Sequence, residues 1–554
     1  MRSFCRQMVA LLCLLAPFCA SSEPDKAQQD DQAKTVLKSN TRLVVVDVVV
    51  NDSKGTPVAN LKSQDFTVLE DGRPQQISIF SFQQPESGSI VESTTHLPAN
   101  VFTNAPVAKP TSLNVILLDA LNGQFASRSY ARDQLIKFLE NDQTRQPVAV
   151  YALENHLKLL HDFTTETREV VSAIRGYKPA VVNHLDSIKA LASPFTQKGE
   201  FQTSDRNIQT TLAALDFLGQ ALKGYPGRKN LIWLSEGFPM EMFPDLFPSA
   251  AAIGIAHNTV STDTPGFGNP ISSPAQADMI HASQVSSTNW ANSDYSEQVR
   301  KVANELMNAQ VAVYPIDAAG VGKVSQTSNL STMRQVAERT GGKTFVNQND
   351  LQASIRGSID DGSTYYTLAY YPDNKNWSGQ LRQIDIKTTR PGVSLRYRHG
   401  YYALDPAGFT KEQDSKKMVE DFSRGLALDM PSATAVLFRT VLTSPVDNTQ
   451  KVVVNFAIDP HTITFVRQED GGQQANLSCA VVVFSEKGSL VTNTLTTVPA
   501  TVKADDFPKL MDSTFPCRSA VELKPGKYSL RLGVLDRMSR LMGTTTASVT
   551  VPLP

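Results

Sequence analysis

The sequence NVILLD at residues 114–119 decides the fold of the central part of this chain. Two later stretches, NLIWLSEG at 230–237 and VAVYPID at 311–317, have the same form, an apolar run that stops on or just before an acidic residue. Apolar runs without alternation are typical of strands buried on both faces, as in a parallel sheet covered by helices. The three stretches therefore predict a doubly wound, Rossmann-like α/β domain.

The acidic residues at the ends of these runs predict a site. In open α/β sheets, ligands bind at the carboxyl ends of the strands, near the point where the strand order reverses. We therefore expect Asp119, Glu236 and Asp317 to lie along one edge of the sheet. Carboxylates repel one another there unless a cation or a basic group joins them. The alternative is that these residues only end strands and cap loops.

Length, charge and the first residues narrow the class of protein. A chain of 554 residues is too long for one core, and its net charge of −1 provides no basic surface for nucleic acid. A basic start at 1–6 precedes an apolar stretch from Met8 to Ala20, which is the pattern of a signal peptide. We expect residues 1–22 to be that signal and the mature protein to be exported, to the periplasm, the cell envelope or the medium.

The cysteines raise two further questions. Cys19 could instead become a lipid-modified amino terminus, although the bulky Phe18 before it fits that processing poorly. Once the leader is removed, Cys479 and Cys517 remain, and an even number in an exported chain favours one disulfide over two free thiols. No later segment has 18 consecutive apolar residues, so we expect no transmembrane helix after the leader.

Composition and periodicity divide the rest of the chain. Alternating strands and helices predict one α/β domain with an insertion rich in Pro, Ser, Thr and Asn. The half-sized β segments before and after this domain lack the strands to bury a core alone, so we expect them to form one sandwich. The expected divisions are a polar tether at 23–40, a β segment at 41–83, a linker at 84–111, the α/β domain at 112–358 with its insertion at 238–297, a second β segment at 364–402, a connector at 403–430 and a carboxyl-terminal β-sandwich at 431–554.

Several stretches resemble one known group of proteins. They are LVVVDVVV at 43–50, DFTVLEDG at 65–72, LLDALN at 117–122, PGRKNLIWLSEGFP at 226–239 and RHGYY at 398–402. Together they make residues 41–405 similar to the von Willebrand factor type A-related proteins of the acidobacterial kind, which are exported and mostly of undefined role. The resemblance implies a type A domain flanked by β-sandwich segments.

The resemblance also implies a divalent cation on the upper rim of the domain, often completed by a carboxylate of the partner. In the family the metal is held by Asp-x-Ser-x-Ser, a loop Thr and a further Asp. Here Asp119 matches the first Asp, but Leu121 and Gly123 replace both serines. No Thr is clearly placed, and Thr211, the nearest by pattern, is expected within a helix. Compensating oxygen ligands for Mg²⁺, Ca²⁺ or Mn²⁺ could come from other polar side chains. The degenerate site that we expect consists of Asp119, Asn122, Ser235, Glu236 and Asp317. The alternative is a domain without metal or other cofactor.

No motif indicates an enzyme. The chain lacks Gly-x-Ser-x-Gly, His-Glu-x-x-His and a phosphate-binding glycine loop. We therefore expect a non-enzymatic binding or adhesion-type protein that takes a protein or peptide ligand at the rim of the type A domain. One alternative is an envelope assembly factor that binds through sheet edges. The other is a periplasmic hydrolase acting at Asp119.

Overall fold

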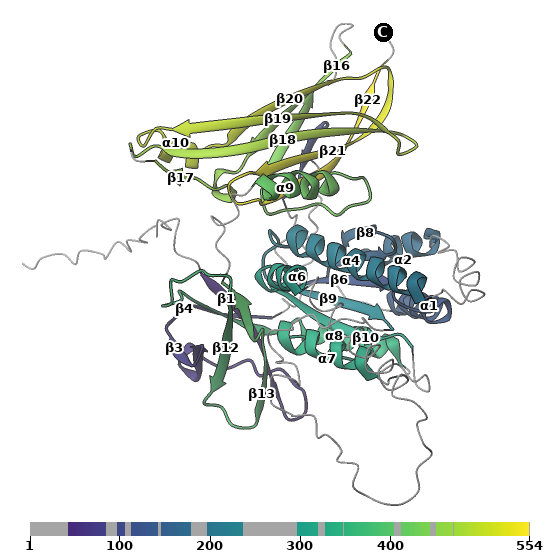
Figure 1. The fold of residues 1–554 in the computed structure, drawn as a ribbon, viewed down its shortest axis with the longest axis vertical. Helices are drawn as coiled ribbons and strands as arrows, with labels where there is room; N and C mark the ends of the chain where they lie inside the picture. The colour runs from purple at the N-terminus through teal and green to yellow at the C-terminus, as the bar shows by residue number, and fades with distance from the viewer. Residues whose placement is uncertain are drawn as a thin grey trace, which may run out of the picture. The chain divides into compact units, whose positions relative to one another are not determined.

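A five-stranded sheet forms the centre of the computed structural model, in the order β10-β9-β6-β7-β8 (Figure 1). Strands β6, β7, β9 and β10 run parallel, and β8 pairs antiparallel with β7 at one edge. Every side chain of β6, β7, β9 and β10 is buried, as their apolar runs predict. The strand bounds are β6 Ser112–Asp119, β7 Val148–Leu153, β8 Leu157–Thr164, β9 Arg228–Ser235 and β10 Val311–Asp317.

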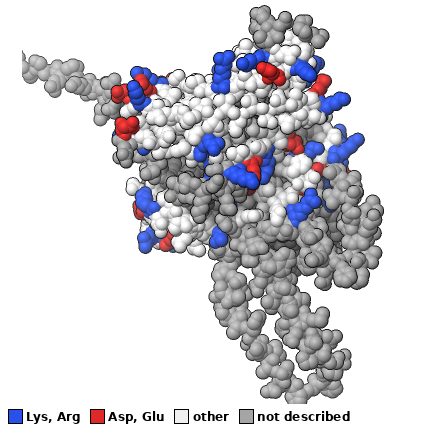
Figure 2. All heavy atoms as spheres, turned by 45° about the horizontal axis from the view of Figure 1, so that its top comes forward, with Lys and Arg blue, Asp and Glu red and all other residues white. Residues whose placement is uncertain are grey.

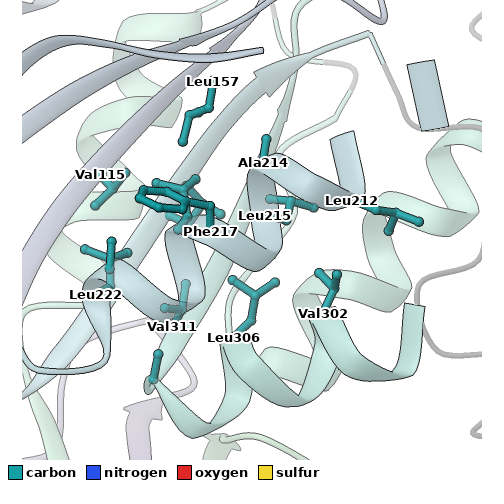
Figure 3. Close-up of a cluster of buried hydrophobic side chains, with 14 of the residues drawn as sticks. Val115, Leu157, Leu212, Ala214, Leu215, Phe217, Leu222, Val302, Leu306 and Val311 are labelled. Atoms are coloured by element: carbon teal, nitrogen blue, oxygen red, sulfur yellow. The ribbon is translucent and has the colours of Figure 1, made fainter. Parts of the chain in front are cut away.

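Helices cover both faces of this sheet. On one face, apolar side chains of α4 and α6 pack on the odd-numbered residues of β6, such as Val115 and Leu117 (Figure 3). On the other face, α1, α2 and α8 pack on the even-numbered residues, such as Ile116. Val336 of α7 joins the first cluster. The helix bounds are α1 Phe125–Asn141, α2 Thr167–Gly176, α4 Gln197–Leu222, α6 Ser296–Asn308, α7 Thr327–Thr340 and α8 Leu351–Asp361.

The structure describes residues 43–84, 97–105, 112–141, 146–178, 197–236, 296–319, 327–346, 348, 350–403, 412–443, 450–468 and 470–552. The expected signal peptide at 1–22, the tether at 23–40 and nearly all of the insertion at 238–297 lie outside these residues. Among the described residues, no helix is both long enough and apolar enough to cross a membrane.

The β segments before and after the α/β domain pair with each other. One sheet has the order β13-β1-β11-β4, the other has the order β14-β12-β2-β3, and each contains strands from both segments. Asp71 and Gly72, both with positive φ, make the tight turn from β2 to β3. The strand bounds are β1 Val44–Asp52, β2 Phe66–Glu70, β3 Arg73–Gln75, β4 Ile77–Gln83, β11 Tyr365–Tyr370, β12 Leu381–Thr388, β13 Val393–Arg396 and β14 Gly400–Tyr402.

The carboxyl-terminal part consists of two further sheets, one of order β20-β16-β15-β5 and one of order β17-β18-β21-β22, with β19 paired to β18. A disulfide between Cys479 of β18 and Cys517 of β20 joins the two sheets. The element bounds are β15 Phe438–Thr443, β16 Lys451–Ile458, β17 Val466–Arg467, β18 Gln473–Ser485, β19 Leu490–Val502, α10 Phe507–Met511, β20 Phe515–Glu522, β21 Gly526–Asp536 and β22 Met542–Val551.

Strand β5, Val101–Thr103, corrects the expectation that 84–111 is only a linker. It pairs antiparallel with β15, at the edge of the carboxyl-terminal sheet. The side chain of the next residue, Asn104, secures the pairing, because its amide donates to the carbonyls of Ala433 and Val436 and its oxygen accepts from the backbone N–H of Phe438. Three residues are too few to show a strand period, so the sequence pattern gave no sign of β5.

Helix α9, Glu412–Gly425, lies in the expected connector at 403–430 and is part of a core. Met418 and Phe422 of α9 belong to the apolar cluster that also contains Phe217 of α4 and Leu535 and Met542 of the carboxyl-terminal sheet. One continuous core therefore joins the α/β domain to the strands that follow it. The expected mixed α/β architecture with additional β-rich parts is confirmed.

Candidate functional site at the carboxyl edge of the sheet

The strand order of the central sheet reverses at β6. The chain passes from β6 to β7 on one side and returns to β9 on the other, so β6 lies between two strands that follow it. The ends of β6, β9 and β10 lie along the same edge, because the strands are parallel with Leu118 beside Leu234 and Asp317 beside Ser235. This edge is where open α/β sheets bind ligands.

Asp119 accepts hydrogen bonds at both carboxylate oxygens. Its Oδ1 accepts from the backbone N–H groups of Leu121 and Asn122 at 3.0 and 2.9 Å. Its Oδ2 accepts from the Ser235 hydroxyl at 2.7 Å, and from the Trp233 indole and the Asn122 amide at 3.1 Å each. Asp119 is only 5% exposed. Its negative charge is therefore balanced by donors from the end of β9 and from the loop after β6.

Thr211 completes this network from helix α4. The Asn122 amide donates to the Thr211 hydroxyl at 3.0 Å, and that hydroxyl donates to the carbonyl of Asn207 at 2.8 Å. Thr211 lies within a helix, as expected, and it is fully buried. It bonds to Asn122 and not to Asp119, so it braces the loop after β6.

Glu236 has separate partners on the opposite face of the sheet. Its carboxylate accepts from the backbone N–H of Gln124 and from the hydroxyl of Ser127, the latter on α1. A Cβ on Gly123 would lie 3.0 Å from Oε2 of Glu236, so the loop approaches this carboxylate closely at a position without a side chain. The loop at 120–124 is therefore held from one side by Asp119 and from the other by Glu236.

Asp317, the third expected carboxylate, lies on the same edge. Its Oδ1 accepts from the backbone N–H of Ala319 at 2.9 Å. Burial is the main cause that raises the pKa of this carboxyl group, and the charge of Glu236 raises it further, against the lowering effect of the Ala319 N–H. Asp317 and Glu236 therefore interact electrostatically, while Asp119 keeps its own set of donors.

Two residues of this edge were missed by the sequence reasoning. Glu154 follows β7, so it ends a fourth apolar run, VAVYAL at 148–153, in the same way as the other three carboxylates. It is buried and accepts from the Tyr177 hydroxyl at 2.6 Å. Burial and the bond to Glu154 both raise the pKa of Tyr177.

Arg128 of α1 donates to the carbonyls of Gly123 and Ala120 and gives the loop a third support. The strand pattern could have identified Glu154, but nothing in the sequence points to Arg128.

The residues fit a divalent cation poorly. Mg²⁺ needs close to octahedral oxygen coordination at about 2.1 Å. Both oxygens of Asp119 already accept from N–H and O–H donors, and a cation there would have to displace the Ser235 hydroxyl or the backbone N–H groups. The described residues contain no group of three or more His, Cys, Asp or Glu side chains placed to hold a metal. Of the five expected ligands, Asn122 and Ser235 both donate to Asp119, while Glu236 and Asp317 accept from other groups.

The most exposed large apolar side chain of the described residues adjoins the supported loop. Phe125, the first residue of α1, is 73% exposed. It follows Gln124, whose backbone N–H donates to Glu236. The edge therefore combines an exposed aromatic ring, the acidic side chains at the strand ends, and a loop that is fixed from both faces of the sheet.

Comparison with known proteins gives only distant similarities. No family model and no curated protein matches the chain. A solved structure of the vWF domain of the type V pili tip protein Mfa5 from Porphyromonas gingivalis is 13% identical, with a TM-score of 0.25, and covers 45% of this chain and 94% of that one. A structure of three N-terminal domains of Mfa5 is 10% identical, with a TM-score of 0.25, and covers 87% of this chain and 100% of that one.

A third similar structure is an aerotolerance-related membrane protein from Bacteroides fragilis that carries multiple mutations to serines. It is 9% identical, with a TM-score of 0.24, and covers 45% of this chain and 98% of that one. At such TM-scores these similarities carry no argument about function, which we derive from the residues of this chain.

Proposed function

We propose that this chain is an exported, non-enzymatic binding protein of the adhesion type, which recognises a protein or peptide partner at the carboxyl edge of its central sheet. The observation that carries the proposal is the loop at 120–124, held between Asp119 and Glu236 with Phe125 exposed beside it. Exposed apolar side chains on a rigid support are typical of binding surfaces, because little conformational entropy is lost when a partner packs on them. The leader-like sequence at 1–22 supports export.

The bonding of Asp119 favours a structural role over a catalytic one. An aspartate nucleophile needs an oxygen free to attack, and here both oxygens accept from donors that fix the loop and the end of β9. The same bonding favours recognition without a metal. The partner that suits this edge offers an apolar surface for Phe125 and a basic group for the half-buried Glu236, since opposite charges are complementary at an interface.

Capture from a cell-envelope extract tests the proposal with the full mature chain. Phe125→Ala should lose the bound partner, because the change removes the exposed ring and leaves the loop bonds in place. Ile79→Ala is the matched control, since Ile79 is also a large exposed apolar residue, at 47%, on β4 of a different sheet. Equal capture by wild type and Phe125→Ala would refute the site and favour the envelope assembly factor that binds through sheet edges. Turnover of a hydrolase substrate by wild type, lost in Asp119→Asn at a temperature where circular dichroism shows that the variant is still folded, would favour the periplasmic hydrolase.

A further inference from the structure

The strand β19 has an unusual edge. It is 13 residues long, pairs only with β18 among the described strands, and contains no charged residue. Along 490–502, the described residues form no backbone hydrogen bonds other than those to β18. The edge strand of the opposite sheet, β20, differs in having Pro516, Arg518 and Glu522.

Edges of this kind are normally protected. Proteins place charged residues or proline on edge strands because unpaired N–H and C=O groups form a template for another strand. β20 follows this rule with a proline and two charges, while β19 has only Pro499. Figure 2, in which the top of Figure 1 comes forward, shows uncharged surface between separate groups of charged side chains. The open, uncharged edge of β19 therefore suits an added strand.

A groove lies beside this edge. It has a volume of about 390 Å³ and runs between α9 and the outer face of β18 and β19. Leu490 and Leu495 of β19 and Val419 of α9 line it and are 59%, 50% and 37% exposed. The other apolar lining residues are Phe422, Leu426, Ala427, Ala480, Val482, Phe484 and Leu535. Exposed apolar side chains on two elements that face one groove indicate a surface for another apolar chain.

The two faces of β19 differ in what they contact. Thr496 bonds to Ser519 of β20 at 2.8 Å and so faces the inside of the sandwich. Asn493 and Leu495 are exposed and line the groove. Because side chains alternate along a strand, a segment added at this edge places every second side chain over the groove.

One charge defines the chemistry of the occupant. Among the described residues, Arg537 is the only charged one that lines the groove. Its guanidinium donates to the Ser478 hydroxyl at 3.4 Å, and it forms no ion pair with any acidic residue in the described parts of the chain. A carboxylate on the occupant would complement this cation.

We propose that β19 and this groove bind an extended segment of another protein by strand addition, independently of the carboxyl edge of the central sheet. The segment is apolar at alternate positions, is otherwise uncharged, and has one carboxylate opposite Arg537. Main-chain hydrogen bonds to β19 supply the affinity, and the groove selects the side chains.

Fluorescence anisotropy with the full mature chain tests the proposal. The probe is a fluorescein-labelled, amidated nonapeptide that alternates threonine with valine or leucine and ends in aspartate. Leu495→Lys should weaken its binding at least tenfold, because the change places a charge on the edge beside the groove. Ile79→Lys is the matched control, being an equally exposed apolar residue on the edge strand β4, and should bind like wild type. Arg537→Gln should remove the preference for this probe over the same peptide ending in asparagine.

Three results would overturn the proposal. One is no binding of the probe to the wild type at millimolar concentration, and another is equal binding by wild type and Leu495→Lys when both show the same thermal unfolding. The third is a wild-type dimer in light scattering that Leu495→Lys converts to a monomer without any peptide binding, since the occupant would then be a second copy of this chain.

Discussion

Asp119→Asn should destabilise the fold without changing the shape of the side chain. The carboxylate accepts from two backbone N–H groups on one oxygen and from Trp233 and Ser235 on the other, and Asn122 donates to it as well. An asparagine has one acceptor oxygen, so one of these two sets of donors faces an NH₂ group in either orientation. Hydrogen bonds to charged groups contribute about 1.5–3 kcal/mol each, and a buried donor without a partner costs about 1–3 kcal/mol.

The expected loss is therefore about 3–5 kcal/mol of the free energy of unfolding, a large part of the total stability of a typical domain. Urea unfolding followed by circular dichroism measures it, and tryptophan fluorescence reports on the environment of Trp233. Asp385→Asn, the same change on the exposed face of β12, should leave the midpoint unchanged. A loss below about 1 kcal/mol for Asp119→Asn would show that the donors are not bound to a charged group. A loss that appears only with added Mg²⁺ would show that a metal balances the charge.

Four further outcomes follow from the same structure. Titration calorimetry with Mg²⁺, Ca²⁺ or Mn²⁺ at millimolar concentration should give no saturable heat, and a stoichiometric heat would contradict the internal bonding of Asp119. Asp317→Asn should be more stable than wild type at pH 7. The raised pKa of Asp317 means that the protonated carboxyl stabilises the fold below the ordinary value of 3.8, and that this contribution is lost as the pH rises through the folded pKa. The stability advantage of the variant should therefore shrink toward pH 4, and an advantage that does not shrink would refute the raised pKa. Replacing Cys479 and Cys517 by alanine should lower the free energy of unfolding by about 4 kcal/mol, because the disulfide closes a loop with a sequence separation of 38. An unchanged midpoint in urea would exclude the disulfide. Lys229 is buried and its pKa is lowered to about 7, so the wild type gains stability as the pH rises from 7 toward 10.5. Lys229→Met should lack this gain, and equal pH slopes for the two proteins would contradict it.

The sequence predicted the sheet and its carboxyl edge because strands that are apolar on both faces must be buried on both faces, and a parallel sheet covered by helices provides this. The same reasoning placed Asp119, Glu236 and Asp317 on one edge, and Glu154 could have been added by it. Reasoning from apolar runs could not show that each carboxylate has its own hydrogen-bond donors. The donors to Asp119, for example, come from β9 and from the loop after β6. Those contacts depend on strand register and on the path of the backbone, neither of which leaves a local pattern.

Strand β5 was missed for a related reason. Its three residues become a strand only through β15, more than three hundred residues later in the chain. The metal site stays a prediction: the residue types suit a cation, but Asn122 and Ser235 donate hydrogen bonds to Asp119, which no local pattern in the sequence shows.

The pairing of β1 with β11 has a consequence for how the chain matures. Val44 lies beside Tyr370, so β1 has no strand partner among the described residues until the whole α/β domain has left the ribosome. During that time VVVDVVV at 44–50 is an unpaired segment rich in β-branched residues, which is the composition most prone to intermolecular aggregation. Slowing synthesis before residue 365 should therefore lengthen this unpaired period and increase aggregation.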